Sequence, residues 1–229
     1  MITQQEKPAG RFSTWLRYTR NMLVKDEGID VPCGKCNACC KSSYFIHIRP
    51  EETRTLKHIP RKILFSAPGL PKGNVLMGYD ENGHCPMLIN EKCSIYDHRP
   101  LTCRKYDCRI FSAAGIVAGD YDKILITQHI KKWKFSYLSE VDYKQHFAVK
   151  AAAMFLKKYA NCFPDGVVPS NSTQLAILAI KVYDVFLEYN SNSSKTGCTD
   201  PDIEIINAVM KANEKVEASC NKVKGRYPV

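Results

Sequence analysis

Cysteine is the residue type whose spacing points most directly to chemistry in this sequence. Four thiols fall within eight residues, in the run Cys33-Gly-Lys-Cys36-Asn-Ala-Cys39-Cys40, and four more follow at Cys85, Cys93, Cys103 and Cys108. Packing does not explain this crowding, because a thiol in a core behaves as a small apolar group that Val or Ala can replace. We therefore predict that thiols from two separated segments converge on a metal.

Disulfide bonds are the alternative use for these thiols. Cys39 and Cys40 are neighbours, so their Cα atoms lie about 3.8 Å apart, less than an unstrained bridge normally spans. The segment 1–10 is polar and shows no signal peptide, and no apolar run reaches the ~20 residues of a membrane span. We therefore expect a cytoplasmic protein, in which thiols stay reduced. Cysteines outside the motifs are expected to be unliganded thiols, namely Cys162, Cys198 and Cys220.

The spacing leaves the kind of metal open. Cys33-x₂-Cys36 is typical of one half of a zinc knuckle, and Cys103-x₄-Cys108 fits the looser spacings that zinc accepts. The run through Cys39 also matches the opening of a bacterial ferredoxin motif, although the fourth cysteine and its proline are not in the expected place. Soft thiolates suit both zinc and iron–sulfur clusters.

Further motifs surround the second group of cysteines. They read Cys85-Pro-Met-Leu88, Cys93-Ser-Ile-Tyr96, Arg99-Pro100 and Cys103-Arg104, and Cys108 closes the series. Together with the first cysteine run, these motifs resemble the CxxCxxCC cysteine-cluster family over residues 30–112. The members of this family are described as zinc- or iron-chelating proteins, and the flagellin lysine N-methylases are related to them.

Carried over residue by residue, the resemblance implies a ligand set and two supporting arginines. Arg99 and Arg104 are expected beside the ligands, where guanidinium groups offset thiolate charge and donate hydrogen bonds to sulfur. The neighbours Cys39 and Cys40 are not expected to chelate one ion together, so one of them bridges, faces a second site or is a reactive thiol. The implied metal ligands are Cys33, Cys36, Cys39, Cys40, Cys85, Cys93, Cys103 and Cys108.

Histidines are weaker candidates for ligands. His84 and His98 flank the cysteines, but eight thiols already supply enough donors. Asp142 and His146 lie one helical turn apart, a spacing that metals use. An ordinary pair on a helix surface is the favoured interpretation of these two residues.

The same resemblance suggests a function. In the flagellin methylases a cysteine-held iron–sulfur cluster is implicated in methyl transfer to lysine, which favours an iron–sulfur cluster, of the [4Fe–4S] kind, over zinc. It implies a protein or peptide substrate modified by methyl transfer or redox chemistry, and it admits S-adenosylmethionine, although the sequence has no G-x-G-x-x-G loop. The alternative is a non-catalytic zinc-binding scaffold or interaction module. Whether the protein is an enzyme stays open at this point.

Hydrophobic periodicity predicts an α+β fold, with a small cysteine-rich part of short strands and helices followed by an all-helical C-terminal part. An amphipathic helix is expected over residues 11–25, and strands over 44–48, 75–79, 84–89 and 123–127. The Asn-Gly pair within residues 80–83 predicts that strands 75–79 and 84–89 form a hairpin. That hairpin would deliver Cys85 on its return strand.

Three helices are expected after residue 138. The first spans 139–159 with Ser139 as its N-cap, the second begins after a cap at Ser172 or Thr173, and the third runs from Asp200-Pro201 to about residue 222. The buried face of the first is predicted to carry Phe147, Ala151, Met154 and Phe155.

The domain boundary is placed near residue 138. It separates a cysteine-cluster metal-binding domain with the N-terminal helix, residues 1–137, from a helical region, residues 138–229, and the two could also pack as one unit. The formal charge is +10, but the basic residues lack the interleaved aromatics typical of single-strand nucleic-acid binding. A nucleic-acid partner is therefore not expected, and the sequence does not indicate an oligomeric state.

Overall fold

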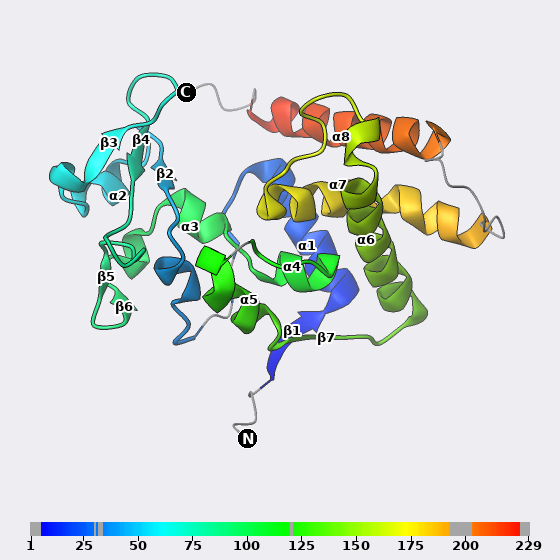
Figure 1. Cartoon of the computed structure of the whole chain (residues 1–229), viewed down its shortest axis with the longest axis horizontal. Coiled ribbons are helices and arrows are strands. Elements are labelled where there is room, and N and C mark those ends of the chain that lie inside the picture. Colours follow the sequence, from blue (N-terminus) through cyan, green and yellow to red (C-terminus); the bar gives the residue numbers. More distant parts are fainter. Residues whose placement is uncertain (1–5, 30, 32–33, 120, 193–202, 225–229) are drawn as a thin grey trace. The chain divides into compact units, whose positions relative to one another are not determined.

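The computed structural model describes residues 6–29, 31, 34–119, 121–192 and 203–224 (Figure 1). Cys33, Cys198 and the predicted helix start at Asp200-Pro201 lie outside these ranges. The fold is mixed α+β, as predicted, with its longest helices at the C-terminal end. The chain forms two compact units whose segments interleave along the sequence. We call them the helical unit and the cysteine unit.

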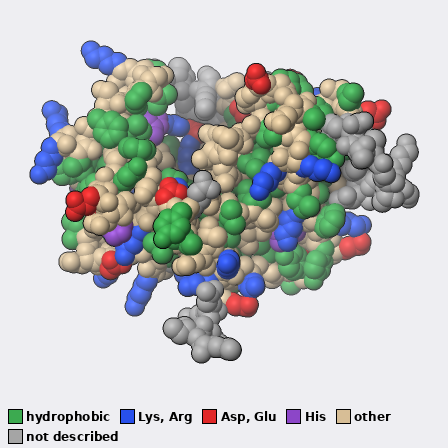
Figure 2. All heavy atoms as spheres, viewed as in Figure 1, with side chains coloured by type: hydrophobic (Ala, Val, Ile, Leu, Met, Phe, Trp, Pro, Cys, Tyr) green, Lys and Arg blue, Asp and Glu red, His purple; other side chains and the backbone are tan. Residues whose placement is uncertain are grey.

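One face of the molecule carries its charges in dispersed positions. On the face shown in Figure 2, Lys and Arg side chains lie scattered among Asp, Glu and uncharged groups and form no single block. Among the described residues, no helix is both long enough and apolar enough to cross a membrane.

The helical unit draws on segments 1–26, 108–118 and 130–229, as far as these are described. The pairing of β1 with β7 is parallel and has an irregularity between Pro8 and Gly10, where proline offers no N–H to the ladder. The elements of this unit are β1 (Lys7–Arg11), α1 (Phe12–Lys25), α4 (Arg109–Ala114), β7 (Trp133–Ser136), α6 (Glu140–Lys158), a 3-10 turn (Ala160–Cys162), α7 (Ser172–Asn192) and α8 (Ile203–Lys224).

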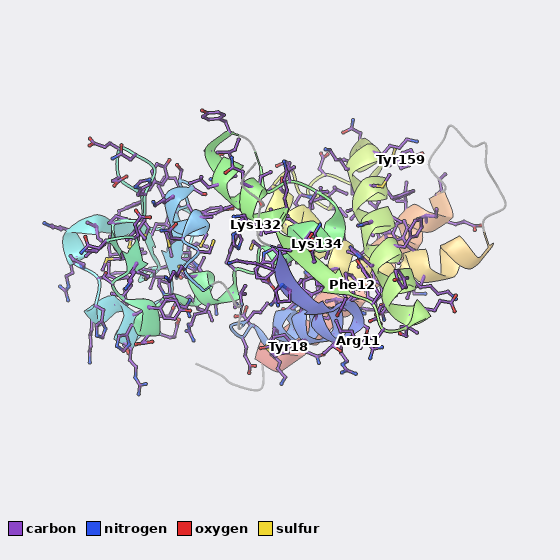
Figure 3. All side chains as sticks on the ribbon, turned by 90° about the horizontal axis from the view of Figure 1, so that it is seen from below. Arg11, Phe12, Tyr18, Lys132, Lys134 and Tyr159 are labelled. Atoms are coloured by element: carbon purple, nitrogen blue, oxygen red, sulfur yellow. The ribbon has the colours of Figure 1, made fainter. Side chains whose placement is uncertain are left out.

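An aromatic cluster lies where β1 passes into α1, at the labelled residues Arg11 and Phe12 in Figure 3. The fully buried Phe12 ring stacks on His146 of α6 with 4.2 Å between ring centroids. The Tyr137 hydroxyl lies 2.6 Å from His146 Nδ1. Burial, with a smaller effect of Lys150, lowers the pKa of His146 to about 4. His146 is therefore a neutral ring in a core rather than part of a surface pair.

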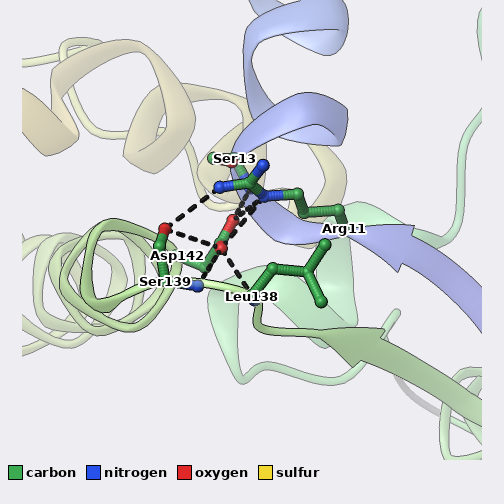
Figure 4. Close-up of polar contacts among 5 residues, drawn as sticks. All are labelled: Arg11, Ser13, Leu138, Ser139 and Asp142. Atoms are coloured by element: carbon green, nitrogen blue, oxygen red, sulfur yellow. Dashed lines mark hydrogen bonds and ion pairs between the residues drawn. The ribbon is translucent and has the colours of Figure 1, made fainter.

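A polar network joins the start of α1 to the start of α6 (Figure 4). Arg11 Nε donates to both carboxylate oxygens of Asp142, at 3.0 and 3.1 Å, and the Ser13 N–H donates to Oδ1 at 2.9 Å. Asp142 also accepts the Ser139 N–H at 3.0 Å, and the two residues form the capping box that begins α6. Burial opposes the charge of Asp142, but the hydrogen bonds from Ser13 and Arg11 hold its pKa below the usual range. The prediction of Ser139 as N-cap is confirmed, and the prediction of a surface pair is wrong.

The buried face of α6 differs from the predicted one. Phe147 and Met154 are 62% and 70% exposed, whereas the alanines at 148, 152 and 153 are fully buried. Helix α6 packs mainly on α7, whose Ala176 and Ala179 are also fully buried. Small residues on both helices allow their backbones to approach closely, whereas Phe147 and Met154 point to solvent. A ranking of residues by hydrophobicity alone cannot anticipate this choice.

The cap of α7 also needs correction. The Asn171 side chain, rather than Ser172 or Thr173, caps α7 by accepting the N–H groups of Thr173 and Gln174 at 3.0 and 3.2 Å. In α8, Ile206 and Val209 are buried, whereas Ile203 is 70% exposed.

The cysteine unit comprises segments 27–107 and 119–129, as far as these are described. Its core contains Ile48, Met77 and Met87, against which the half-buried Cys85 and Cys93 pack. The elements of this unit are a 3-10 turn η1 (Ala38–Lys41), β2 (Ile46–Ile48), α2 (Thr53–Lys57), η2 (Arg61–Ile63), β3 (Leu64–Ser66), β4 (Val75–Met77), β5 (Leu88–Ile89), β6 (Lys92–Cys93), η3 (Tyr96–His98), α3 (Leu101–Lys105), η4 (Tyr121–Lys123) and α5 (Ile124–Ile130).

Two predictions about strands in this unit are wrong. Strand β4 pairs antiparallel with β2 and β3, while β5 pairs with β6, so the expected hairpin between 75–79 and 84–89 does not form. The Asp80 carboxylate instead accepts the N–H groups of Asn82 and His84 and closes a turn just before Cys85. Residues 123–127, expected as a strand, lie in η4 and the helix α5.

Candidate metal centre

The turn η1 presents the first described cysteines of the motif. The Cys40 N–H donates to the Asn37 carbonyl at 2.9 Å, and Ser42 Oγ donates to the Ala38 carbonyl at 2.6 Å. These bonds close a tight turn in which Cys39 is exposed and Cys40 is half-buried. The Cys40 carbonyl accepts the Cys85 N–H at 2.7 Å. The two cysteine segments are therefore joined directly through their backbones.

The loop after Cys85 directs backbone amides toward its sulfur. The N–H groups of Met87 and Leu88 both donate to the Cys85 thiol, and the Leu88 N–H also lies 2.9 Å from the Cys85 carbonyl. Amides that donate to sulfur favour the thiolate, because they stabilise its negative charge. The sequence Cys85-Pro-Met-Leu88 thus forms a local cradle of amides that partly offsets the burial of the Cys85 sulfur.

Cys93 has a similar, smaller cradle. It lies on β6 opposite Leu88, and the Ile95 N–H donates to its thiol. The Ser94 N–H donates to the Met87 carbonyl at 2.9 Å, which holds the loop after Cys85 against the strand of Cys93.

Helix α3 carries Cys103 and is fixed at its first turn. The Leu101 N–H donates to a Glu52 carboxylate oxygen at 2.6 Å, and Thr102 Oγ1 donates to the His47 carbonyl at 2.7 Å. A carboxylate at a helix N-terminus is favourable, because the first amides have no partner within the helix.

Four thiols from these elements lie within electrostatic reach of one another: Cys40, Cys85, Cys93 and Cys103. Burial raises the pKa of Cys103, and the charges of Cys85, Cys40 and Cys93 raise it further. Burial also raises the pKa of Cys85 to about 11 and, to a lesser extent, that of Cys93. For Cys40, a hydrogen bond with the Cys39 thiol raises the pKa first and burial adds to it. Four deprotonated thiols at these positions therefore need a positive centre among them.

Arg99 supplies part of that positive charge. It lowers the pKa values of Cys40, Cys93 and Cys103, and its guanidinium stacks on the Tyr96 ring at 3.6 Å. Among the described residues, buried Arg99 Nε has no hydrogen-bond partner. A buried donor beside a set of thiols fits an anionic thiolate–metal centre, because such a centre gives it an acceptor.

Arg104 has a different position. Its side chain is exposed, and Nε donates to the Arg99 carbonyl at 3.2 Å. Its own carbonyl accepts the Ile29 N–H at 2.8 Å, and a Cβ on Gly28 would lie 3.0 Å from Arg104 Cβ. Arg104 therefore holds the backbone of Arg99 and the chain that leads into the cysteine run.

The other predicted ligands lie elsewhere or in different contacts. Cys36 Sγ lies 3.3 Å from Nδ1 of His129, which the sequence did not suggest as a ligand. Cys108 belongs to the helical unit, where it is buried and accepts the indole N–H of Trp133 at 3.2 Å. Of the cysteines expected to be unliganded, Cys162 is exposed and Cys220 is buried. Cys33 lies outside the described residues.

The donor chemistry of the four thiols fits a soft metal. Thiolates bind zinc and iron–sulfur clusters, and amide and guanidinium donors around sulfur are the usual supporting groups. Within the described ranges, no three His, Cys, Asp or Glu side chains stand in a direct coordination arrangement. Binding would therefore draw the sulfur atoms closer together.

Comparison with known families identifies the cysteine-rich segment. Residues 32–141 match the model of the CxxCxxCC family, described as a putative zinc- or iron-chelating domain. This segment is similar to the CxxCxxCC family. The match confirms the resemblance inferred from the motifs and extends beyond residue 112, so that it includes α5 and His129. Comparisons with curated proteins and with solved structures found no match.

Proposed function

We propose that this CxxCxxCC-like domain holds a metal centre through the thiolates of Cys40, Cys85, Cys93 and Cys103. The observation that carries the proposal is geometric: the Cys85 N–H donates to the Cys40 carbonyl at 2.7 Å, and Cys85 and Cys93 pack against one core of the cysteine unit. The electrostatic interaction of these thiols with Cys103 supports it. The remaining motif cysteines, Cys33, Cys36, Cys39 and Cys108, stay in the proposed ligand set outside this group of four.

The centre that we propose is an iron–sulfur cluster of the [4Fe–4S] kind. Such a cluster takes four cysteine thiolates, and hydrogen bonds to sulfur and nearby charge tune its potential. The amides of Met87, Leu88 and Ile95 supply such bonds here, and Arg99 supplies the charge. A single Zn²⁺ ion is the second candidate, because four thiolates also complete a tetrahedral all-cysteine zinc site.

We further propose that the domain acts on a protein or peptide, by methyl transfer or redox chemistry. When bound, the cluster would supply electron transfer or a Lewis-acidic iron. The chain's own residues would limit access of water, because Met87 and Ile95 are buried beside the cysteines, and would offset negative charge through Arg99. If the bound metal is zinc, we propose instead that the domain is a non-catalytic zinc-binding scaffold.

Anaerobic purification with quantification of iron, acid-labile sulfide and zinc tests the centre. We expect stoichiometric iron and sulfide with broad visible absorbance, and loss of both in Cys85→Ser. Cys162→Ser is the matched control, because Cys162 is exposed and lies in the helical unit. Colourless protein with stoichiometric zinc would refute the iron–sulfur cluster and support the zinc-binding scaffold. Equal metal content in Cys85→Ser and the parent protein would refute the proposed ligand set.

Methyl transfer needs its own assay. The reconstituted protein is incubated with labelled S-adenosylmethionine and lysine-containing peptides, and incorporation of label is measured. We expect incorporation that depends on the loaded centre. Equal incorporation by Cys85→Ser, or none with a fully loaded centre, would remove methyl transfer from the proposal.

A further inference from the structure

A buried histidine contacts one of the motif cysteines. His129 Nδ1 lies 3.3 Å from Cys36 Sγ, and the histidine is 8% exposed. In a tetrahedral zinc site, Zn–S bonds of about 2.3 Å and Zn–N bonds of about 2.0–2.1 Å place sulfur and nitrogen about 3.6 Å apart. The two donors therefore lie within about 0.3 Å of the separation at which they would share an ion.

The helix that carries His129 is fixed to the cysteine turn. Lys123, just before α5, donates its ammonium group to the Ser42 carbonyl, directly after η1. The same ammonium lies 4.3 Å from the centre of the Tyr44 ring, and the Tyr44 hydroxyl lies 3.1 Å from that of Tyr106. The start of α5, the helix that carries His129, is thus fixed to the residues that directly follow η1.

The pair consists of residues other than those of the four-thiol group. Cys40, Cys85, Cys93 and Cys103 interact with one another, whereas Cys36 contacts His129. Cys39 connects the two places, because its thiol hydrogen-bonds Cys40 and its spacing from Cys36 is that of a zinc knuckle.

We propose that Cys36 and His129 are ligands of a second metal position, which takes a single Zn²⁺ ion. Cys39, three positions after Cys36 and exposed, supplies the third donor once its side chain turns toward the pair, and water supplies the fourth. Imidazole and thiolate together are a common donor set for zinc. The inference rests on the proposed function, since it assumes that the domain loads metal, but its ligands are different residues.

The test uses zinc K-edge X-ray absorption, which detects imidazole through its outer-shell scattering, together with zinc stoichiometry. Reduced, metal-free full-length protein is saturated with zinc and desalted. We expect imidazole scattering in the parent protein and its loss, with about one zinc per chain, in His129→Ala. His129→Cys should keep the zinc but lose the imidazole signal, because a thiolate replaces the nitrogen donor. His98→Ala is the control, because that ring stacks on His58 instead, and it should behave as the parent.

Two further outcomes separate this inference from the proposed function. If Cys85→Ser loses zinc but keeps imidazole scattering, the second position is independent and the inference stands. If the parent shows no imidazole scattering, or if both His129 variants retain it with full zinc content, the inference is overturned whatever Cys85→Ser does. The His129→Cys variant keeps the test valid should His129→Ala fold poorly.

Discussion

Metal loading of the four-thiol group should release about four protons for each zinc ion bound at pH 7. The reason is that the pKa values of Cys40, Cys85, Cys93 and Cys103 are all raised, mainly by burial and by their mutual interactions. All four are thus protonated thiols before the metal binds, and a zinc ligand is a thiolate.

The size of the effect follows from Cys85. Its pKa of about 11 is about four units above neutral pH, so its deprotonation at pH 7 costs about 5 kcal/mol. The apparent binding free energy of a structural zinc site at pH 7, about 10–16 kcal/mol, already includes the cost of deprotonating its thiols and therefore depends strongly on pH. With four such thiols, the apparent association constant should rise by about 10⁴-fold for each unit of increasing pH in the neutral range.

Zinc competition against a chromophoric chelator at pH 6 and 7 measures this slope, and calorimetry in buffers of different ionisation enthalpy counts the protons. Both are made in the His129→Ala background, which removes the second proposed position. Cys103→Ser should release about three protons, and Cys162→Ser should match the background. An affinity that does not change with pH, or release of one proton or none, would show that these thiols are not the ligands.

Three predictions concern stability. Gly83→Ala should destabilise the cysteine unit by about 1–2 kcal/mol in urea unfolding, because φ is +76° and a Cβ would lie 2.4 Å from Ser43 Oγ. Gly69→Ala, where φ is +73° but no atom lies near the added Cβ, should destabilise it less. Equal destabilisation by the two substitutions would contradict the steric argument. Ser139→Ala should cost about 1 kcal/mol through loss of the α6 cap, while Ser172→Ala, next to the true cap Asn171, should change the unfolding midpoint little; the reverse order would contradict our cap assignments. The pKa of the neutral His146 is lowered to about 4, so its contribution to the stability of the fold should be complete above pH 6.5. That contribution, at most about 3 kcal/mol, should be lost as pH falls toward 4. A thermal-unfolding profile from pH 7 to 4 that is the same in His146→Gln would argue against this prediction.

Much of the chemistry could be predicted from residue type and spacing. The convergence of Cys40, Cys85, Cys93 and Cys103 on a metal stays a prediction, which the hydrogen bond from the Cys85 N–H to the Cys40 carbonyl supports. Capping at Ser139 was also predictable, because N-cap residues and the first acids of a helix act over only a few positions.

Other features required the tertiary structure. The hairpin prediction failed because the Asn-Gly pair lies in a turn organised by the Asp80 carboxylate, while β4 finds partners on both sides in β2 and β3. Because residues 123–127 were predicted as a strand, the helix α5 was missed. The contact of His129 with Cys36, 93 positions earlier, was missed with it.

By itself, the sequence determined which residues are candidate metal ligands, the α+β class and the approximate limits of the long helices. These depend on side-chain chemistry and on hydrophobic patterns that repeat within one or two turns. Only the tertiary structure decided that alanines face α7 from α6, that Asp142 and His146 are buried, and that α1 belongs with the C-terminal helices. Burial and contact partners depend on residues far apart in the chain, and no local pattern records which of them will meet.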